Sequence, residues 1–404
     1  MEKKTKKKII FLSVLLLPFG LLISFVTSDL RTSAVDLFTP YESSSELTLD
    51  GVADEAAWTS ATSLLVETDG GKLPDTIVTL KAVYTSANIY LYASWEDDTF
   101  SATRGRYNVS GYVYDQSLAA GGSEDRIAFL WEIGEVAGFD TVGGMVICHS
   151  LTDSVSLGTG EIADMWHVKA ARGGGFTSAT ASGITIDPTN FQLTAGTVSL
   201  QGFADDKYVD DTGRHGDDGD GPYSDNAVDG HAMYIEESPT DWIDAMILTT
   251  TEISAGETLL ISEGGGALTS AVDAYVALNA NVPRHILRTP TLSHGDIEVA
   301  LRWVDGVYSL ETKRALDTGN TDDVAFDPTV SGEYYFSLAI FDDSGQESDG
   351  TQEHSTYSGP IALTFTASGG DAAIPGFGIL LILGSVFAIP FVIIKSIKKQ
   401  KSME

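Results

Sequence analysis

Short runs that alternate apolar and polar residues constrain the fold of this chain more than any other feature. The segment Thr76–Trp95 alternates, breaks at Ser86-Ala87-Asn88 and resumes, which predicts a hairpin of two half-buried strands. Asp305-Gly306 separates two further runs and is a hairpin turn signal. No long segment has a clean apolar period of 3.6 residues. The other alternating runs are Arg126–Ile133, Met145–His149, Trp166–Ala170, Ile297–Trp303, Val307–Lys313 and Tyr334–Phe341.

We therefore expect an all-β fold, an antiparallel β-sandwich with long loops. The segment Gly202–Gly230 is rich in Asp and Gly and has no periodicity, which predicts a long loop or insertion. Residues 351–371 combine a last strand, Ile361–Thr366, with a short polar stalk. The sandwich domain itself is expected over residues 35–350.

Charge-free apolar runs lie near both ends of the chain. Ile9–Ser28 follows five lysines, and residues 372–394 precede the basic segment 395–404. Each run is long enough to cross a bilayer, at about 20 residues per span. The first predicts a signal peptide or N-terminal anchor within residues 1–34, and the second predicts a transmembrane helix with a cytoplasmic tail. Because lysines favour the inner side, we expect a cell-membrane protein whose bulk is extracytoplasmic.

The part of the chain between the tails is strongly acidic. The chain has 24 basic and 57 acidic residues, and the tails hold nine lysines and two glutamates. This leaves 15 basic and 55 acidic residues, a net charge of −40. Such a surface repels nucleic acid, so we expect no nucleic-acid partner. The single cysteine excludes a disulfide within the chain.

That cysteine lies in the segment GGMVICHS, residues 143–150, as Cys148 followed by His149. A c-type haem attachment site reads C-x-x-C-H, and Met145 stands where its first cysteine would be. His149 is the best candidate for a first iron ligand, with Met145 as the alternative. On an extended strand these two residues face one side and Cys148 the other, which favours b-type haem over a single-thioether c-type haem. The alternative is that Met145 and Cys148 simply fill a core.

A second iron ligand must come from elsewhere in the chain. Met233 and His167 are the first candidates, and Lys169 is the next. His231 lies close to Met233 in the sequence and is a further candidate. Trp166 could pack on a porphyrin face, although a buried tryptophan is more often part of a core.

Calcium is a separate expectation for the acidic segment DDTGRHGDDGDGPYSDN. Closely spaced carboxylates are the ligands that hard cations prefer, and the spacing does not match an EF-hand. The candidate ligands are Asp217, Asp218, Asp220 and Asp225. A solvated acidic loop without an ion is the alternative.

Several of these segments, taken in order, resemble the haem-binding domain of the ethylbenzene dehydrogenase gamma subunit. They are also similar to the haem subunit of dimethylsulfide dehydrogenase and to cytochromes that use the same domain. The resemblance covers roughly residues 45–350. It rests on LDGVADEAAW, LKAVYTSANIYLYASWEDDT, EDRIAFLWEI, GGMVICHS, DMWHVKAAR, GFADDKYVDD, GPYSDN, LRWVDGVYSLETKRAL and YFSLAIFDDSG.

The resemblance implies a β-sandwich-like domain that holds one haem and transfers electrons without being catalytic itself. It implies a redox partner protein, a molybdenum enzyme or another cytochrome. In the gamma-subunit type the haem is not covalently bound, and its iron takes a methionine and a lysine. In c-type relatives the segment that matches GGMVICHS carries the full C-x-x-C-H, whereas this chain lacks the first cysteine.

A different function also fits the opening motif. LDGVADEAAW resembles the start of family-9 carbohydrate-binding modules, in which Trp95, Trp131 and Trp242 of this chain could form a sugar-stacking platform. Under that interpretation, no functional role is assigned to Met145, His149 or the segment DMWHVKAAR. A structural component of a surface layer is a third and less specific option. We therefore expect a membrane-anchored haem protein first and a carbohydrate-binding module second.

Overall fold

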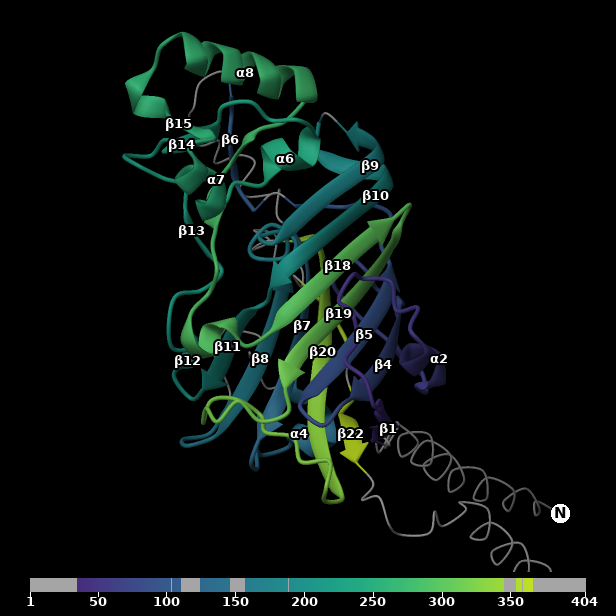
Figure 1. The fold of residues 1–404 in the computed structure, drawn as a ribbon. Coiled ribbons are helices and arrows are strands. Elements are labelled where there is room, and N and C mark those ends of the chain that lie inside the picture. The colour runs from purple at the N-terminus through teal and green to yellow at the C-terminus, as the bar shows by residue number, and fades with distance from the viewer. Residues whose placement is uncertain are drawn as a thin grey trace, which may run out of the picture. The chain divides into compact units, whose positions relative to one another are not determined.

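Two β-sheets form the body of the molecule in a computed structural model of the chain (Figure 1). The structure describes residues 35–102, 104–109, 124–145, 157–187, 189–344, 354–357 and 359–365. The chain divides into two compact units, Met1–Asp327 with Gly332–Phe365, and Pro328–Ser331 with Thr366–Glu404. All the elements named below belong to the first unit.

The first sheet has the strand order β1-β22-β20-β7-β8-β11-β12, and β21 pairs with β20. Its neighbours are antiparallel except for the parallel pair β1 and β22. The strands are β1 (Asp36–Phe38), β7 (Glu124–Ile133), β8 (Ile162–Lys169), β11 (Asp205–Asp210), β12 (Gly213–Gly216), β20 (Gly332–Ser344), β21 (Ser355–Thr356) and β22 (Ile361–Phe365).

The second sheet has the order β2-β4-β5-β19-β18-β10-β9, and β3 pairs with β4. It is antiparallel apart from the short pair β2 and β4. The strands are β2 (Tyr41–Glu42), β3 (Leu64–Glu67), β4 (Ile77–Tyr84), β5 (Asn88–Glu96), β9 (Ser178–Asp187), β10 (Gln192–Phe203), β18 (Glu298–Val304) and β19 (Val307–Ala315).

Short helices and three two-stranded ladders complete the described part of the chain. The ladders pair β6 (Arg106–Tyr107) with β16 (Val282–Pro283), β13 (Tyr223–Asp225) with β17 (His285–Leu287), and β14 (Tyr234–Glu236) with β15 (Thr258–Leu260). The helices are α2 (Ala56–Ser60), α4 (Phe139–Val142), α6 (Trp242–Met246), α7 (Thr250–Ala255), α8 (Gly266–Leu278), η1 (Ile261–Glu263) and η2 (Leu292–Gly295).

Alternate residues of both sheets fill one core between them. Phe129 and Trp131 of β7 pack in the same apolar cluster as Trp303 of β18 and Leu310 of β19. Trp131 stacks on Phe336 of β20 with ring centroids 4.4 Å apart. Apolar burial on facing sheets is the main stabilising contribution in such a layered fold. The expected sandwich-like, mostly β architecture is therefore confirmed.

The predicted hairpins are confirmed at the level of register. β4 and β5 pair antiparallel across the break at residues 85–87, and β18 pairs with β19 from Glu298–Lys313 to Val304–Val307. Asp305 and Gly306 have φ angles of 45° and 93°, as a two-residue turn of the primed type requires. The turn residues thus close this hairpin as the sequence predicts.

The structure contradicts the sequence prediction for residues 202–230 and contains a helix, α8, that was not predicted. The segment 202–230 is not one long loop, because it contains β11, β12 and β13. Its buried carboxylates Asp205 and Asp206 occupy strand positions, so an acidic composition concealed the strands. The 13-residue helix α8 was not predicted, since only Leu268, Ala271 and Tyr275 are buried and its apolar pattern is weak.

The segment around Met145 also differs from the expected strand. Met145 is helical. The expectation that residues 145 and 149 face the same side of an extended strand therefore does not hold at Met145. At the other end, β22 lies between β1 and β20, which makes it an integral strand of the first sheet. In the described part of the chain, no helix is long and apolar enough to span a bilayer. Both terminal apolar runs lie outside the described residues.

Candidate functional site

The face of the first sheet that points away from the main core carries an unusual set of polar side chains. Alternation along β8 places Trp166 in the core between the sheets and His167 on the opposite face. We call this second side the outer face. By cross-strand pairing it comprises Arg126, Ala128 and Leu130 of β7, Ala163, Met165, His167 and Lys169 of β8, Asp205, Lys207 and Val209 of β11, and Ser337, Ala339 and Phe341 of β20.

His167 lies at the centre of the outer face. Ala128 pairs with it on one side and Asp205 on the other, and its ring stacks on Phe341 with centroids 5.8 Å apart. The side chain is buried, and its Nε2 atom has no hydrogen-bond partner among the described residues. Burial, and then the charge of Lys169, hold the pKa of His167 well below its usual range. The imidazole is therefore neutral, which is the form that binds a metal.

Lys169 lies two residues further along the same face and belongs to a buried charge network. Its Nζ forms an ion pair with Asp205, and Lys207 lies 3.1 Å from the same carboxylate oxygen. His294 contacts the other oxygen of Asp205 at 2.8 Å. Burial lowers the pKa of Lys169 to about 7 against the attraction of Asp205. A neutral amine is thus accessible near neutral pH.

Asp205 holds this network together. Burial by itself raises the pKa of its carboxyl, but the charge of Lys169 and the hydrogen bond from His294 outweigh burial and hold the pKa well below its usual range. A buried carboxylate with three cationic or protonatable neighbours is stable only because each of its oxygens is paired. The network positions Lys169. His167 is the cross-strand neighbour of Asp205, but its Nε2 has no hydrogen-bond partner among the described residues.

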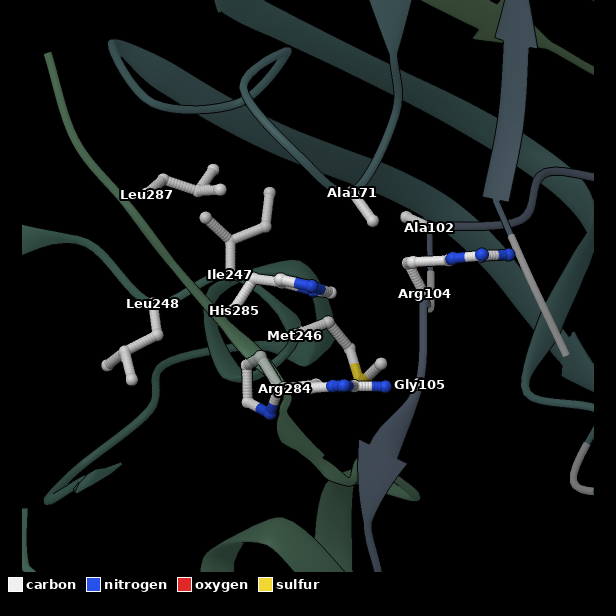
Figure 2. A pocket seen from close by; sticks show the side chains of 11 residues that line it. Ala102, Arg104, Gly105, Ala171, Met246, Ile247, Leu248, Arg284, His285 and Leu287 are labelled. Atoms are coloured by element: carbon white, nitrogen blue, oxygen red, sulfur yellow. The ribbon is translucent and has the colours of Figure 1, made fainter. Parts of the chain in front are cut away.

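Figure 2 shows a small pocket whose lining includes Ala171, two residues after the end of β8. It encloses about 280 Å³ of empty space, part of which is open to solvent. Arg104, Arg284 and His285 line it together with Met246, so its polar groups are mainly basic. We assign no cofactor to this pocket.

The other predicted haem residues are placed differently. Met145 is buried in a cluster with Leu130 and Met165, so it packs on the outer face. Trp166 is fully buried on the core side of β8, where it packs against Trp131. The structure thus assigns Trp166 a packing role in the core and does not bring it to His167.

Two further predicted residues, Met233 and His231, do not join the outer face in the described structure. Met233 lies in the segment before β14, where its backbone bonds to Asn226 and Ile261. His231 lies in the same segment and is exposed. Cys148 and His149 lie outside the described residues.

The predicted calcium ligands are also separated by the fold. Asp217 is 4% exposed, whereas Asp218, Asp220 and Asp225 are exposed. Asp220 lies 3.2 Å from Arg288, and Asp225 lies near His285. The four residues therefore do not form one group around a common point.

No tryptophan is available for the expected sugar platform. Trp95, Trp131 and Trp242 are at most 3% exposed. The other three of the chain's six tryptophans, Trp58, Trp166 and Trp303, are fully buried. The platform prediction is wrong because these rings fill the cores instead.

Four residues of the site were not predicted from the sequence: Asp205, Lys207, His294 and Phe341. Local pattern did not reveal the first two, because the segment GFADDKYVDD buries charged residues at strand positions and lacks apolar alternation. No local signal existed for His294, which reaches Asp205 from η2 across 89 residues of sequence.

Three solved structures show similarity to this chain. A family 9 carbohydrate-binding module from Caldicellulosiruptor kristjanssonii in complex with cellotriose has 8% identity, covers 85% of this chain and 98% of its own, and gives a TM-score of 0.30. The same module with glucose has 9% identity, 83% and 100% coverage and a TM-score of 0.30. A protein from Bacteroides uniformis ATCC 8492, described as putative carbohydrate-binding, has 8% identity, 82% and 100% coverage and a TM-score of 0.31.

A search of the curated proteins finds no match. By contrast, residues 55–353 match the family described as Ethylbenzene dehydrogenase. The matched range contains both β7 and β8, and with them the whole set of β8 residues on the outer face. Because the match spans most of its 404 residues, the chain belongs to the ethylbenzene dehydrogenase family.

Proposed function

We propose that this chain is a membrane-anchored, extracytoplasmic haem-binding protein that transfers electrons to or from a partner redox enzyme and is not itself catalytic. The observation that carries the proposal is the buried, neutral His167, whose Nε2 has no hydrogen-bond partner among the described residues. An unpaired buried polar atom is costly, and in a native protein it calls for an explanation. Coordination of an iron atom would supply the missing partner.

The residues on the outer face fit a haem in three respects. His167 offers an imidazole nitrogen, Lys169 offers an amine that is partly neutral near pH 7, and Met145 packs on the same face. Ala128 pairs with His167, and Ala339 on the next strand pairs with Ala128. Both alanines present little side-chain bulk above the sheet. A bound haem would supply one-electron redox chemistry at its iron, while the protein sets ligand identity, burial and solvent access.

His167 is our first choice for an iron ligand and Lys169 is the alternative. Lys169 already pairs with Asp205, so binding iron would require it to leave that carboxylate. The resemblance to the gamma-subunit type favours a methionine and a lysine as the two iron ligands. Lys169 and Met145 therefore remain candidate ligands. His149 and Cys148 remain candidates from the sequence, and a covalent thioether would have to involve Cys148. We favour b-type haem.

The test is a visible spectrum of the full-length chain, purified from a host that supplies haem and a cytochrome maturation system. We expect a Soret band, and extraction with acid-acetone followed by a pyridine haemochrome assay to release the haem as b-type. Haem that stays with the polypeptide would indicate a thioether through Cys148 and contradict the b-type assignment. Absence of haem in both forms would overturn the proposal and leave glycan binding as the function to screen.

Matched variants identify the ligand. His167→Ala should lower the haem content or shift the Soret and α bands, and Lys169→Met should leave the ligand-sensitive bands in place. The control is Met165→Leu, a buried change of similar volume on the same strand and face, which should leave the spectrum unchanged. A normal spectrum in His167→Ala together with a shifted one in Lys169→Met would transfer the ligand role to Lys169.

A further inference from the structure

A buried acidic cluster lies on the core side of the first sheet, opposite the outer face. Asp164 comes from β8, Asp206 from β11, and Asp323 from the loop between β19 and β20. One carboxylate oxygen of each lies within 4.8 Å of the others. None of the three residues is more than 4% exposed. Segments far apart in the sequence therefore bring three carboxylates to one enclosed point.

Each of these carboxylates keeps an oxygen without a partner. Asp164 accepts hydrogen bonds from Arg314 at 2.7 Å and Trp166 at 3.0 Å through Oδ2, while its Oδ1 has no partner. Oδ2 of Asp206 and Oδ1 of Asp323 are also buried without a partner among the described residues. Such free acceptors are rare in a protein interior, because each loses its hydration and gains nothing in return.

Asp217 is a fourth, independent indication of a ligand. It is 4% exposed, and neither of its carboxylate oxygens has a partner among the described residues. Its backbone N–H donates to the carbonyl of Asp206, at 3.4 Å. Burial, followed by the charges of Asp164 and Asp323, raises the pKa of Asp217 to about 8. Its carboxyl is therefore close enough to Asp164 and Asp323 for their charges to act on it.

The charges of the cluster do not balance. Arg314 is the one cation that the described structure pairs with these residues, through Asp164 and Asp323. Full ionisation of the four carboxylates would leave three negative charges uncompensated in the interior, which is strongly unfavourable. A hard divalent cation would compensate two of these charges and fill the free acceptor positions together.

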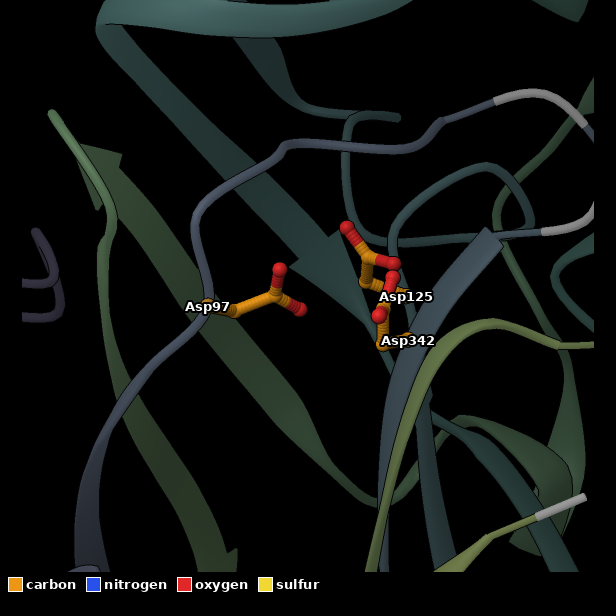
Figure 3. A group of neighbouring side chains, drawn as sticks. All are labelled: Asp97, Asp125 and Asp342. Carbon is orange, nitrogen blue, oxygen red and sulfur yellow. The ribbon is translucent and has the colours of Figure 1, made fainter. Parts of the chain in front are cut away.

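A second buried acidic trio has a different character. Asp97, Asp125 and Asp342 point toward one another (Figure 3). Both oxygens of Asp125 already accept hydrogen bonds, among them one from Tyr308 at 2.5 Å. Asp97 has a single oxygen without a partner. This trio lacks the set of free oxygens that distinguishes the first cluster.

We propose that Asp164, Asp206, Asp217 and Asp323 bind a calcium ion. Calcium binds oxygen ligands at roughly 2.3–2.6 Å, so two oxygens on one ion lie at most about 5.2 Å apart. The separation of up to 4.8 Å among Asp164, Asp206 and Asp323 satisfies this limit, and Asp217 adjoins them through the backbone of Asp206. The donors are carboxylates without nitrogen or sulfur, a set that favours calcium over zinc.

The ion would join parts of the fold that are otherwise separate in sequence. It links β8 and β11 of the first sheet, the residue that follows β12, and the loop beyond β19 of the second sheet. It lies on the other side of β8 from His167, so the proposal does not depend on haem. Calcium would act as a structural clamp between the two sheets.

The test uses the full-length chain after treatment with a chelator, titrated with calcium and separately with terbium. Trp166 donates to Asp164, so excitation of tryptophan should sensitise luminescence from terbium bound in place of calcium. We expect saturable luminescence that calcium displaces, and a rise in Tm on calcium addition. Absence of both signals would overturn the proposal, as would displacement by magnesium at the same concentration as by calcium.

Paired variants distinguish the cluster from the adjacent acidic surface. Asp217→Asn and Asp206→Asn should each lower calcium affinity by more than about tenfold, since even outer partners of metal ligands have effects of that size. Asp218→Asn changes an exposed neighbour and should bind like the parent chain.

The sign of the stability effect gives a second readout. In chelator, Asp217→Asn should be at least as stable as the parent chain, because the amide avoids the cost of burying a carboxyl that is ionised in the unfolded chain. In saturating calcium it should have the lower Tm, because the parent chain gains the bound ion. Equal calcium affinity in Asp217→Asn, Asp206→Asn and Asp218→Asn would refute the assignment.

Discussion

Single buried carboxylates explain several chemical properties of this protein. Asp97 lies beside Asp125 and Asp342 in the interior, with its side chain 3% exposed (Figure 3). Burial, and then the charge of Asp342, raise the pKa of Asp97 to about 8. The unfolded chain has an ordinary value near 3.9. The folded state therefore retains a proton that the unfolded state releases between these two values.

This difference predicts a loss of stability with rising pH. Because the folded pKa is raised, the contribution of Asp97 is fully present below about pH 4 and is lost as the pH rises to about 8. Asp97→Asn stays neutral and keeps the acceptor for the backbone N–H of Thr99. At pH 8 the variant should exceed the parent chain in unfolding free energy by at least about 1.4 kcal/mol, the equivalent of one pKa unit.

Urea unfolding at several pH values, with chelator present, measures this difference. Asp98→Asn is the matched control, because Asp98 is the exposed neighbour of Asp97. It should change the pH dependence little. A stability difference between Asp97→Asn and the parent chain that is the same at pH 5 and pH 8 would contradict the assigned proton.

At the scale of elements, Glu311 attaches the segment before α2 to the second sheet. Its carboxylate accepts hydrogen bonds from the backbone N–H groups of Asp50 and Gly51, at 3.0 and 2.8 Å, and from Trp58 Nε1 at 2.7 Å. Gly51 has a φ of +79°, and a Cβ there would lie 2.9 Å from that of Arg302. Three residues of the motif LDGVADEAAW, Asp50, Gly51 and Trp58, thus donate to one buried carboxylate on β19.

Removal of that charge should loosen the attachment. Glu311→Gln keeps the size of the side chain, but it replaces one acceptor oxygen with an NH2 group and removes the negative charge. Hydrogen bonds to a charged group contribute about 1.5–3 kcal/mol. We expect a loss of about 2 kcal/mol in unfolding free energy, measured by urea denaturation. Glu298→Gln, on the neighbouring strand and 54% exposed, is the control and should cost well under 1 kcal/mol. Equal losses in both variants would show that Glu311 does not carry the attachment.

β8 shows how one strand can serve two sites. Its outer side chains include His167 and Lys169, and its core side carries Asp164 and Trp166. A strand places successive side chains on opposite faces, so the proposed haem face and the proposed calcium site are separated by the thickness of one sheet. A one-residue shift in the pairing of β8 would exchange both sets and destroy both sites.

At the scale of the whole molecule, net charge governs encounters with charged molecules. The chain carries −33 at pH 7, so its field attracts cations and repels anions over about one Debye length, roughly 10 Å at 0.1 M salt. If the chain holds haem, oxidation of the reduced protein by cationic hexaammineruthenium(III) should slow as salt is added. Oxidation by anionic ferricyanide should become faster. Stopped-flow measurements of both reactions check this, and the same salt dependence for both oxidants would contradict steering by net charge.

Local sequence predicted much of the fold. The alternating runs located β4, β5, β7, β8, β18, β19, β20 and β22, because side-chain direction in a strand follows a period of two residues. Local pattern failed where charged residues are buried, as at Asp205 and Asp206 in β11. Their burial depends on partners from distant segments, which a local pattern does not contain.

The sequence by itself determined the β architecture, the hairpin turn at Asp305-Gly306 and the family motifs, since these depend on neighbours along the chain. Only the tertiary structure decided which face each polar residue occupies and which partners it meets. It separated Asp217 from Asp218 and assigned all six tryptophans to cores. It also left Nε2 of His167 without a hydrogen-bond partner among the described residues, beside the Lys169–Asp205 network. The physical reason is that burial and electrostatic pairing are properties of packed surroundings, which form only when distant strands assemble.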